Sequence, residues 1–474
     1  MSSSTGWTKN GFLLPGHNID PGVRCFLSWR CTDLLVSNWN NCPRVEAAMR
    51  SFRSQEEARD ILGQTDRCIP RGLGRSYGDC SLGENIISTP GFRRFIHLDP
   101  AKGILECEAG TSLDQILSVI IPHGWFLPVT PGTSRVTLGG AIASDVHGKN
   151  HHLHGALGRH VLDLRLLTPQ GHVLVCSKNE NPAIFQAVCG GMGLLGLILS
   201  ARISLMPLES VFIRQKTIPA YDLDELMSFF DSHHQSTYTV AWMDCLQRGR
   251  HLGRGLFMHG EHCRSHEAPQ SQLIPPGCKG ISIPFTLPFR ALTPAGIKAF
   301  NSLYFHRKSR RTGYEISSIE SFFYPLDALS NWNLLYGKKG FLQYQFVLPR
   351  STSRSGLQKI LQHINSFGQP PYLAVLKLLG KGQGPLSFAQ PGYTLALDFP
   401  IRPGVFSLLN ALDRVVQKLG GRIYLAKDAR MKKHMLWEGY PRAKEFVELK
   451  KRLDPENKLS SLQSRRLGLC QNPY

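Results

Sequence analysis

Two glycine-rich stretches constrain the fold of this chain more than any other feature of its sequence. Residues 71–79 read Arg-Gly-Leu-Gly-Arg-Ser-Tyr-Gly-Asp, and residues 131–148 read Pro-Gly-Thr-Ser-Arg-Val-Thr-Leu-Gly-Gly-Ala-Ile-Ala-Ser-Asp-Val-His-Gly. Glycines and small hydroxyl residues at this spacing let backbone N–H groups crowd around an anion or a flat ring without Cβ clashes. Both stretches follow strand-like runs, so the pair predicts one dinucleotide held from two sides.

Each stretch also has a simpler explanation. Taken alone, residues 71–79 could form an ordinary tight turn. They lack the Gly-Lys-Ser/Thr of a Walker A loop, and the order of strand, G-x-G-x-x-G and helix with a later ribose-binding acid is not met. The sequence therefore supports neither of the two standard nucleotide folds.

Four separated motifs resemble a known family. They are the two glycine-rich stretches, the second continued by Lys-Asn-His-His at 149–152, then Gln-Tyr-Gln-Phe at 343–346 and Ala-Lys-Asp at 426–428. The glycine-rich pair resembles the PCMH-type FAD-binding domain of the vanillyl-alcohol-oxidase and p-cresol-methylhydroxylase flavoprotein superfamily. Within it, the four motifs together are similar to the decaprenylphosphoryl-β-D-ribose 2'-oxidase family, over about residues 38–466.

The resemblance implies an α+β fold with two domains, a PCMH-type FAD-binding domain and an inserted substrate domain built on an antiparallel sheet. A length of 474 residues also exceeds one ordinary core and favours two domains. We expect an N-terminal extension without assigned function over 1–35, the FAD-binding domain over 36–210, the substrate-binding domain over 211–420, and a return to the FAD-binding domain over 421–474.

Local patterns predict individual elements. An early helix is expected over 43–62, followed by strands over 95–99 and 104–108 and a helix that begins at Ser112 and stops at Gly124. Segments 162–168 and 172–177 flank Pro-Gln-Gly and predict a hairpin. Later, a one-sided apolar pattern predicts a helix over 405–419, and residues 422–428 read as a strand that re-enters the FAD-binding domain.

Polar residues interrupt two apolar strands. Alternation over 342–348 directs four bulky residues to a core and places Gln343 and Gln345 together on the opposite face, where a solvated face is an equally good explanation. Lys377 lies in a run so apolar that it needs either a pocket or a snorkelling position at a sheet edge. In the resembled oxidases the matching glutamines line the substrate pocket, and the resemblance favours a pocket for Lys377.

Oxidation of a secondary alcohol needs a hydride acceptor, a group that takes the hydroxyl proton, and a pocket that aligns the two. The resemblance implies FAD as cofactor and Lys427, of the Ala-Lys-Asp motif, as the residue beside the substrate hydroxyl. Lys427 can accept a proton only if burial or the cations Lys149 and Lys377 make its neutral form accessible; if charged, it would orient the substrate and stabilise an alkoxide. Tyr77 is the second catalytic candidate, with a packed aromatic as its alternative.

The resemblance completes the predicted site. The expected substrate-binding residues are Lys149, Gln343, Gln345, Lys377, Tyr324 and Thr394. The expected FAD-binding residues are Arg71, Gly72, Leu73, Gly74, Arg75, Ser76, Tyr77, Gly78, Asp79, Gly132, Thr133, Thr137, Gly139, Gly140, Ser144, His147, Gly148, Gly196 and Tyr424. No metal is expected, because the histidines at 151, 152 and 154 lack a carboxylate or cysteine ligand at useful spacing.

Four positions depart from the patterns of the resembled proteins. Arg75 stands where covalent flavoproteins of the superfamily carry a histidine, which implies noncovalent FAD. On the substrate side, Ala396 replaces an active-site cysteine, Thr394 an asparagine and Leu334 an arginine. These three changes concern the identity of the substrate more than the flavin chemistry.

The net charge of +20 calls for an anionic partner, and no nucleic-acid-binding module is found by motif. The resemblance implies oxidation of the 2'-hydroxyl of a polyprenyl-phosphoryl pentose to the 2'-keto sugar. This is the first half of an epimerisation in cell-wall arabinan-type precursor synthesis, completed by a partner short-chain-type reductase. One alternative is an FAD-dependent polyol or aldonolactone oxidase or dehydrogenase that acts on a soluble sugar, such as a D-arabinono-1,4-lactone oxidase-like enzyme. Another is a flavin-binding scaffold without turnover.

The sequence also bears on localisation. No run approaches the roughly 18 apolar residues of a membrane span, and the N-terminus lacks a signal-peptide pattern. Twelve scattered cysteines without C-x-x-C favour reduced thiols, so we expect a cytoplasmic protein. Apolar side chains at Phe285, Leu287, Phe289 and Leu292, followed by the basic run 306–311, would suit a loop lying on the inner face of an anionic membrane. Ordinary solvation is the alternative.

Overall fold

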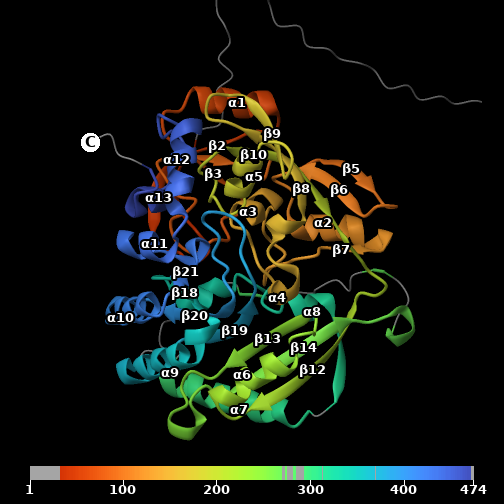
Figure 1. Ribbon diagram of the computed structural model, residues 1–474, viewed down its shortest axis with the longest axis vertical. Coiled ribbons are helices and arrows are strands. Elements are labelled where there is room, and N and C mark those ends of the chain that lie inside the picture. The colour runs from red at the N-terminus through yellow and green to blue at the C-terminus, as the bar shows by residue number, and fades with distance from the viewer. Residues whose placement is uncertain are drawn as a thin grey trace, which may run out of the picture.

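Three larger sheets and two two-stranded ones organise the computed structural model (Figure 1). The structure describes residues 32–269, 273–274, 281–283, 293–311, 313–368 and 370–470. Expectations for the N-terminal extension and for Phe285, Leu287, Phe289 and Leu292 therefore lie largely or wholly outside the described residues. Within them, no helix has both the length and the apolar composition that a bilayer crossing requires.

The first sheet has the order β1-β2-β4-β3, from β1 (Thr32–Ser37), β2 (Arg44–Ser51), β3 (Ile69–Arg71) and β4 (Asn85–Ser88). β4 pairs in parallel with both β2 and β3. The helix predicted over 43–62 is wrong in its first half, because residues 44–51 are β2, paired on both sides. The helix α1 (Gln55–Gly63) begins only after Ser54, whose side chain accepts a hydrogen bond from the Glu57 N–H.

The second sheet is antiparallel, with the order β5-β6-β10-β8-β9. Its strands are β5 (Phe95–Asp99), β6 (Ile104–Glu108), β8 (Val161–Leu167), β9 (Val173–Ser177) and β10 (Leu197–Ser204). The two predicted strands and the hairpin are confirmed. So is the helix α2 (Leu113–Ile120), which begins after Ser112 and continues into a 3-10 turn that Gly124 ends in the left-handed conformation.

Short elements connect this sheet to the glycine-rich region. They are β7 (Trp125–Phe126), which pairs with β11 (Met206–Pro207), and the helices α3 (Leu138–Ala143), α4 (His151–His154) and α5 (Pro182–Val188). Thr137 caps α3 by accepting a hydrogen bond from the Gly140 N–H. The second glycine-rich stretch therefore runs through a turn into one short helix.

The third sheet has eight antiparallel strands in the order β16-β12-β14-β13-β19-β20-β18-β21. They are β12 (Phe212–Ala220), β13 (Tyr238–Met243), β14 (Gly255–His262), β16 (Tyr314–Ser318), β18 (Phe341–Pro349), β19 (Leu373–Leu379), β20 (Gly392–Pro400) and β21 (Arg422–Ile423). A short parallel pair, β15 (Ile281–Ser282) and β17 (Leu329–Ser330), lies apart from it.

Helices cover the two faces of this sheet differently. The helices α6 (Leu223–Ser232), α9 (Arg350–Phe367) and α10 (Val405–Lys418) pack on one face, where Phe230 meets Phe257 and Tyr393. The other face carries Gln343 and Gln345 and is approached by α7 (Pro294–Ser309) and α8 (Ile319–Phe323). The helix predicted over 405–419 is confirmed as α10.

The C-terminal segment returns to the first sheet. In Figure 1 the helices α12 (Ala443–Leu453) and α13 (Leu462–Leu467) lie beside β2 and β3, whereas α11 (Lys433–Gly439) lies beside β21. The Cys68 N–H donates to the Lys458 carbonyl at 2.8 Å. The strand predicted over 422–428 is wrong beyond Ile423. The chain turns into a 3-10 segment, η7 (Leu425–Lys427), because the Lys427 N–H bonds back to the Tyr424 carbonyl at 3.0 Å.

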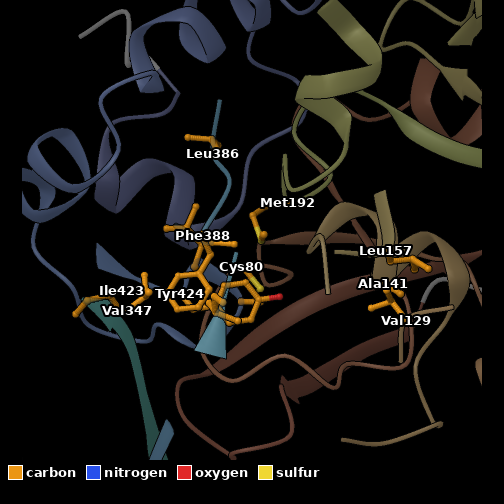
Figure 2. Close-up of a cluster of buried hydrophobic side chains, with 14 of the residues drawn as sticks. Cys80, Val129, Ala141, Leu157, Met192, Val347, Leu386, Phe388, Ile423 and Tyr424 are labelled. Carbon is orange, nitrogen blue, oxygen red and sulfur yellow. The ribbon is translucent and has the colours of Figure 1, made fainter. Parts of the chain in front are cut away.

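The predicted loop at 306–311 is also wrong, since residues 306–309 form the last turn of α7. A buried cluster joins the sheets behind the turn at Tyr424 (Figure 2). In it, Phe388 packs on Tyr424 with ring centroids 4.7 Å apart, close to Cys80 and Met192 of the glycine-rich half. The core thus ties the glycine-rich region to the third sheet.

Candidate active site

A cavity of about 640 Å³ lies between the glycine-rich stretches and the face of the third sheet that carries the glutamines. Both glycine-rich stretches, the turn at Lys427, and parts of α7 and α8 form its walls. This volume lies within the range of about 300–1,000 Å³ that is common for small-molecule sites.

The two glycine-rich stretches touch each other and the turn at Lys427. A Cβ on Gly72 would lie 2.3 Å from Thr137 Oγ1, and one on Gly78, whose φ is +128°, would lie 2.0 Å from the Asp428 carbonyl oxygen. The Tyr77 N–H donates to the Ala426 carbonyl at 2.9 Å. The backbone therefore brings the first stretch and the Ala-Lys-Asp motif together, and only glycine permits these two approaches.

The two predicted catalytic residues lie against each other in the cavity. Lys427 Nζ is 3.6 Å from the centroid of the Tyr77 ring. Burial, helped by the charge of Lys377, lowers the pKa of Lys427 to about 7, although Asp398 opposes the shift. A large fraction of Lys427 is therefore neutral near pH 7, which makes it a competent proton acceptor.

Two further lysines share the cavity. Burial and Lys377 lower the pKa of Lys149 to about 7, and burial lowers the pKa of Lys377 to about 8. Lys149 donates to the Phe322 carbonyl and lies 4.0 Å from the centroid of the Phe322 ring. Both lysines keep some accessible surface, and that surface lines the cavity.

The glutamines are held in fixed orientations. Gln345 Nε2 donates to His147 Nε2 at 2.9 Å and to Thr394 Oγ1 at 3.2 Å. Burial is the main cause that holds the pKa of His147 well below its usual value, so the ring is neutral and its Nε2 accepts. Gln343 Nε2 donates to Asp398 Oδ1 at 2.6 Å. Each amide thus turns its nitrogen toward the protein.

Most of the predicted residues line the cavity. They are Lys427, Tyr77, Lys149, Gln343, Gln345, Lys377, Arg71, Gly72, Leu73, Gly74, Arg75, Ser76, Gly132, Thr133, Thr137, Gly139, Gly140, Ser144, His147, Gly148, Gly196 and Tyr424. The structure thus brings together residues that are widely separated in sequence, and their individual roles stay predictions.

Four predicted residues lie behind the cavity wall instead. Thr394 is fully buried and donates to the Phe346 carbonyl at 2.8 Å while it holds Gln345, and Tyr324 shares a 2.6 Å hydrogen bond with Thr130. Gly78 packs on the Asp428 backbone, and Asp79 pairs with Arg466 at 2.7 Å. The polar or backbone atoms of these four residues make internal contacts, and their direct contact with a ligand stays a prediction.

Sequence reasoning missed several residues of the site. Asp398 is buried beside Gln343, and burial raises its pKa to about 6. Its signal was an acid between Leu397 and Phe399, the same kind of interruption that singled out Lys377. Asp327 accepts hydrogen bonds from Thr133 Oγ1 at 2.6 Å and from the Ser134 N–H at 2.8 Å, and no local pattern indicated it.

The walls fit a dinucleotide such as FAD. Among the described lining residues, Asp327 is the only acid, against the cations Arg71, Arg75, Arg135, Lys149, Lys308, Lys377 and Lys427. The buried Nε of Arg75 has no hydrogen-bond partner, and its guanidinium lies 3.9 Å from the Trp39 ring centroid. No group of three metal-binding side chains occurs among the described residues. The glycines, the cations and the orphaned donor suit a pyrophosphate.

A glycine-lined, mainly cationic cavity that contains a lysine with a pKa lowered to about 7 indicates an FAD-dependent oxidoreductase, and comparisons with known proteins agree. Residues 48–177 match the family model described as FAD binding domain. The chain is 36% identical to decaprenylphosphoryl-beta-D-ribose oxidase of Mycolicibacterium smegmatis over 411 residues, which cover 85% of this chain and 89% of that protein. The chain belongs to this oxidase family.

Two other relatives show how the similarity extends. An uncharacterized protein of Streptomyces coelicolor is 33% identical over 376 residues, 76% of this chain and all of that protein. L-gulonolactone oxidase of Bos taurus is 32% identical over 185 residues, 38% of this chain and 41% of that enzyme. The match to the lactone oxidase is therefore confined to a smaller part of each chain.

Proposed function

We propose that the protein oxidises the 2'-hydroxyl of a polyprenyl-phosphoryl pentose to the 2'-keto sugar. The carrying observation is Lys427, with a pKa lowered to about 7, placed over Tyr77 in a cavity that also holds Gln343, Gln345 and Lys377. The relative from Mycolicibacterium smegmatis, a decaprenylphosphoryl-beta-D-ribose oxidase, supports this substrate class.

Bound FAD supplies the hydride acceptor. The neutral Nζ of Lys427 takes the proton from the hydroxyl oxygen while the carbon that bears this hydroxyl loses a hydride to that acceptor. The C–OH becomes C=O and the lysine ends protonated. General bases of this kind typically contribute about 10²- to 10⁴-fold to rate. Tyr77 packs beneath the lysine and fixes the height of its amine.

The glutamines orient the sugar. The amide nitrogen of Gln345 donates to His147 and Thr394, and the amide nitrogen of Gln343 donates to Asp398. The carbonyl oxygen of each amide remains to accept a hydrogen bond from a sugar hydroxyl. Lys377, with a pKa of about 8, is largely charged at neutral pH and provides a partner for the phosphate.

The third sheet with α6 to α10 forms the substrate domain in this proposal, inserted between the two parts of the FAD-binding domain. The return of α11 to α13 to the first sheet supports an insertion. FAD is held without a covalent bond in our proposal, because Arg75 stands at the histidine position. Acid precipitation should then release the flavin into the supernatant, and flavin in the pellet would contradict this.

The 2'-keto product requires a reductase to complete an epimerisation, and we propose a separate short-chain-type reductase as the partner. We also propose peripheral contact with a membrane that carries the lipid-linked substrate. Exposed basic residues at the end of α7 support that contact.

Anaerobic flavin reduction tests the substrate class. Farnesyl-phosphoryl ribose should bleach the flavin, whereas ribose 5-phosphate and L-gulono-1,4-lactone at equal concentration should bleach it at least about tenfold more slowly, because they bury less apolar surface. Faster reduction by the free lactone would favour the soluble-sugar oxidase. If none of these sugars reduces the flavin, the alternative of a flavin-binding scaffold without turnover is favoured.

A further inference from the structure

The cavity continues past the sugar site as an apolar arm. Strand register places Gln345 opposite Ala396, Ala396 opposite Val375, and Val375 opposite Trp242. All four line the cavity, and paired residues on neighbouring strands share a face. This row crosses from β18 to β13, three strand spacings or about 14 Å.

Apolar residues widen the floor of this arm. Val240 pairs with Met258 on the neighbouring strand β14, and both line the cavity beside Leu373. Ala396 occupies the step next to Gln345, where its small side chain leaves the row open. A polar site at Gln345 therefore passes directly into a hydrocarbon-like surface.

The helix α7 covers the arm. Tyr304 packs edge-on against Trp242, with ring centroids 5.0 Å apart, and Phe300 stacks on Tyr304 at 6.0 Å. Both rings line the cavity, yet Phe300 is 62% exposed, so it stands at the mouth of the arm. Lys308, one turn beyond Tyr304, also lines the cavity and lies 4.0 Å from Glu315.

We propose that this arm binds the hydrocarbon chain of the substrate, with α7 as the element that selects lipid-linked over free sugars. The inference rests on the proposed function and specifies it. The sugar lies at Gln345 and Lys427 and its phosphate at Lys377. The first isoprene units cross Ala396, Val375 and Trp242, and the chain leaves beneath Tyr304 and Phe300.

The test compares phosphoryl riboses that differ only in the alcohol, namely methyl, geranyl and farnesyl. In the parent protein, KM should fall as the chain lengthens, because each buried methylene adds to binding. The double variant Phe300→Ser/Tyr304→Ser should raise KM for the farnesyl compound by at least about tenfold, and more than for the methyl compound. Leu303→Ser is the matched control, since Leu303 lies on the same helix, is 69% exposed and does not line the cavity.

An unchanged dependence of KM on chain length in the double variant would overturn the inference, as would an equal loss for the methyl and farnesyl compounds. Farnesyl phosphate, which carries no sugar, separates this inference from the proposed function. Calorimetry should show that the holoenzyme binds it, more weakly in the double variant than in Leu303→Ser. If farnesyl phosphate binds but no phosphoryl ribose is oxidised, only the proposed function is contradicted. If farnesyl phosphate does not bind, the inference that the arm holds the hydrocarbon chain is overturned.

Discussion

Burial gives the three cavity lysines a chemistry that they lack in water. A solvated lysine has a pKa of about 10.4, whereas the pKa values of Lys427 and Lys149 are lowered to about 7 and that of Lys377 to about 8. The desolvation of the ammonium group is the first cause in each case. For Lys427 and Lys149, repulsion by the charge of Lys377 lowers the pKa further.

Replacing Lys427 tests its role as the proton acceptor. Lys427→Ala should keep bound FAD and lower the rate of flavin reduction by about 10²- to 10⁴-fold. In the parent the rate should rise with pH through about 7, because the neutral amine is the reactive form and its share grows as the proton is lost. Stopped-flow reduction at saturating substrate measures both effects.

Lys432, an exposed lysine on the segment that follows Lys427, supplies the control for this experiment. Lys432→Ala should retain the parental rate and pH profile, since Lys432 lies at the surface outside the cavity. Parental reduction rates in Lys427→Ala would remove the residue from the chemistry.

Asp398 should set the pH range in which Lys427 works. Its negative charge raises the pKa of Lys427, so Asp398→Asn should move the rise in reduction rate to lower pH. The amide keeps the size of the side chain and a hydrogen-bonding oxygen for Gln343. A pH profile that stays in place, or moves to higher pH, would show that Asp398 only supports Gln343.

The position of a residue at the cavity was predictable where a polar side chain interrupts an apolar pattern. This signal singled out Gln343, Gln345 and Lys377, and the family resemblance then favoured a pocket over a solvated face or a sheet edge. Thr394 and Tyr324 could not be placed in this way, because the groups that take up their hydroxyls, Gln345 and Thr130, lie on segments remote in sequence.

At the scale of elements, the C-terminal helix α13 holds the first glycine-rich stretch in place. Arg466 pairs with Asp79 at 2.7 Å and with Asp428 at 2.8 Å, and both carboxylates are buried. Arg466→Ala would leave two buried charges without this partner, so the free energy of unfolding should fall by about 3–5 kcal/mol. Denaturant unfolding of the holoenzyme measures the loss.

The adjacent arginine provides a matched control. Arg465 pairs with Glu84, whose side chain is largely exposed, so Arg465→Ala should cost no more than about 1 kcal/mol. If the free energy of unfolding falls equally in Arg465→Ala and Arg466→Ala, the stabilising role given to Arg466 is contradicted.

The elements most faithfully predicted are those with a local start and stop. Ser112 and Gly124 bound α2, and Pro-Gln-Gly turns the hairpin of β8 and β9. The predictions for 43–62 and 422–428 were wrong over residues 44–51 and 424–428, because pairing with distant strands and a backbone turn at Tyr424 decided the conformation there. Neither influence is visible in a short window of sequence.

At the scale of the molecule, the positive charge is proposed to guide the protein to an anionic membrane. Arg307 and Arg310 are exposed near the end of α7, whereas Arg311 pairs with Glu315 at 2.7 Å and Lys308 faces the cavity. The double variant Arg307→Gln/Arg310→Gln should weaken binding to anionic vesicles by about 2 kcal/mol in free energy, since each basic residue near the surface contributes about 1 kcal/mol. Sedimentation with the vesicles measures this binding. The control variant Lys432→Gln/Lys444→Gln changes exposed lysines on other segments. If both variants bind the vesicles equally well, the basic residues of α7 are merely solvated and do not contact the membrane.

The family and the cofactor were predictable because four separated motifs occur in the same order as in a known oxidase family. The order of the eight strands was not, since β21 and β18 are neighbours that arise from residues about 75 apart in the chain. Only the folded sheet shows that Ala396, Val375 and Trp242 form one row. The apolar arm could therefore not be inferred from sequence.

In the proposed reaction, the 2' carbon of a lipid-linked pentose is the one oxidised in this cavity. Anaerobic flavin reduction with farnesyl-phosphoryl ribose carrying deuterium at the 2' carbon tests it most directly. We predict slower reduction than with the unlabelled compound, and a parental rate when deuterium is placed at the 3' carbon instead. Equal rates for the 2'-labelled and unlabelled compounds, together with a slower rate for the 3'-labelled one, would contradict the account.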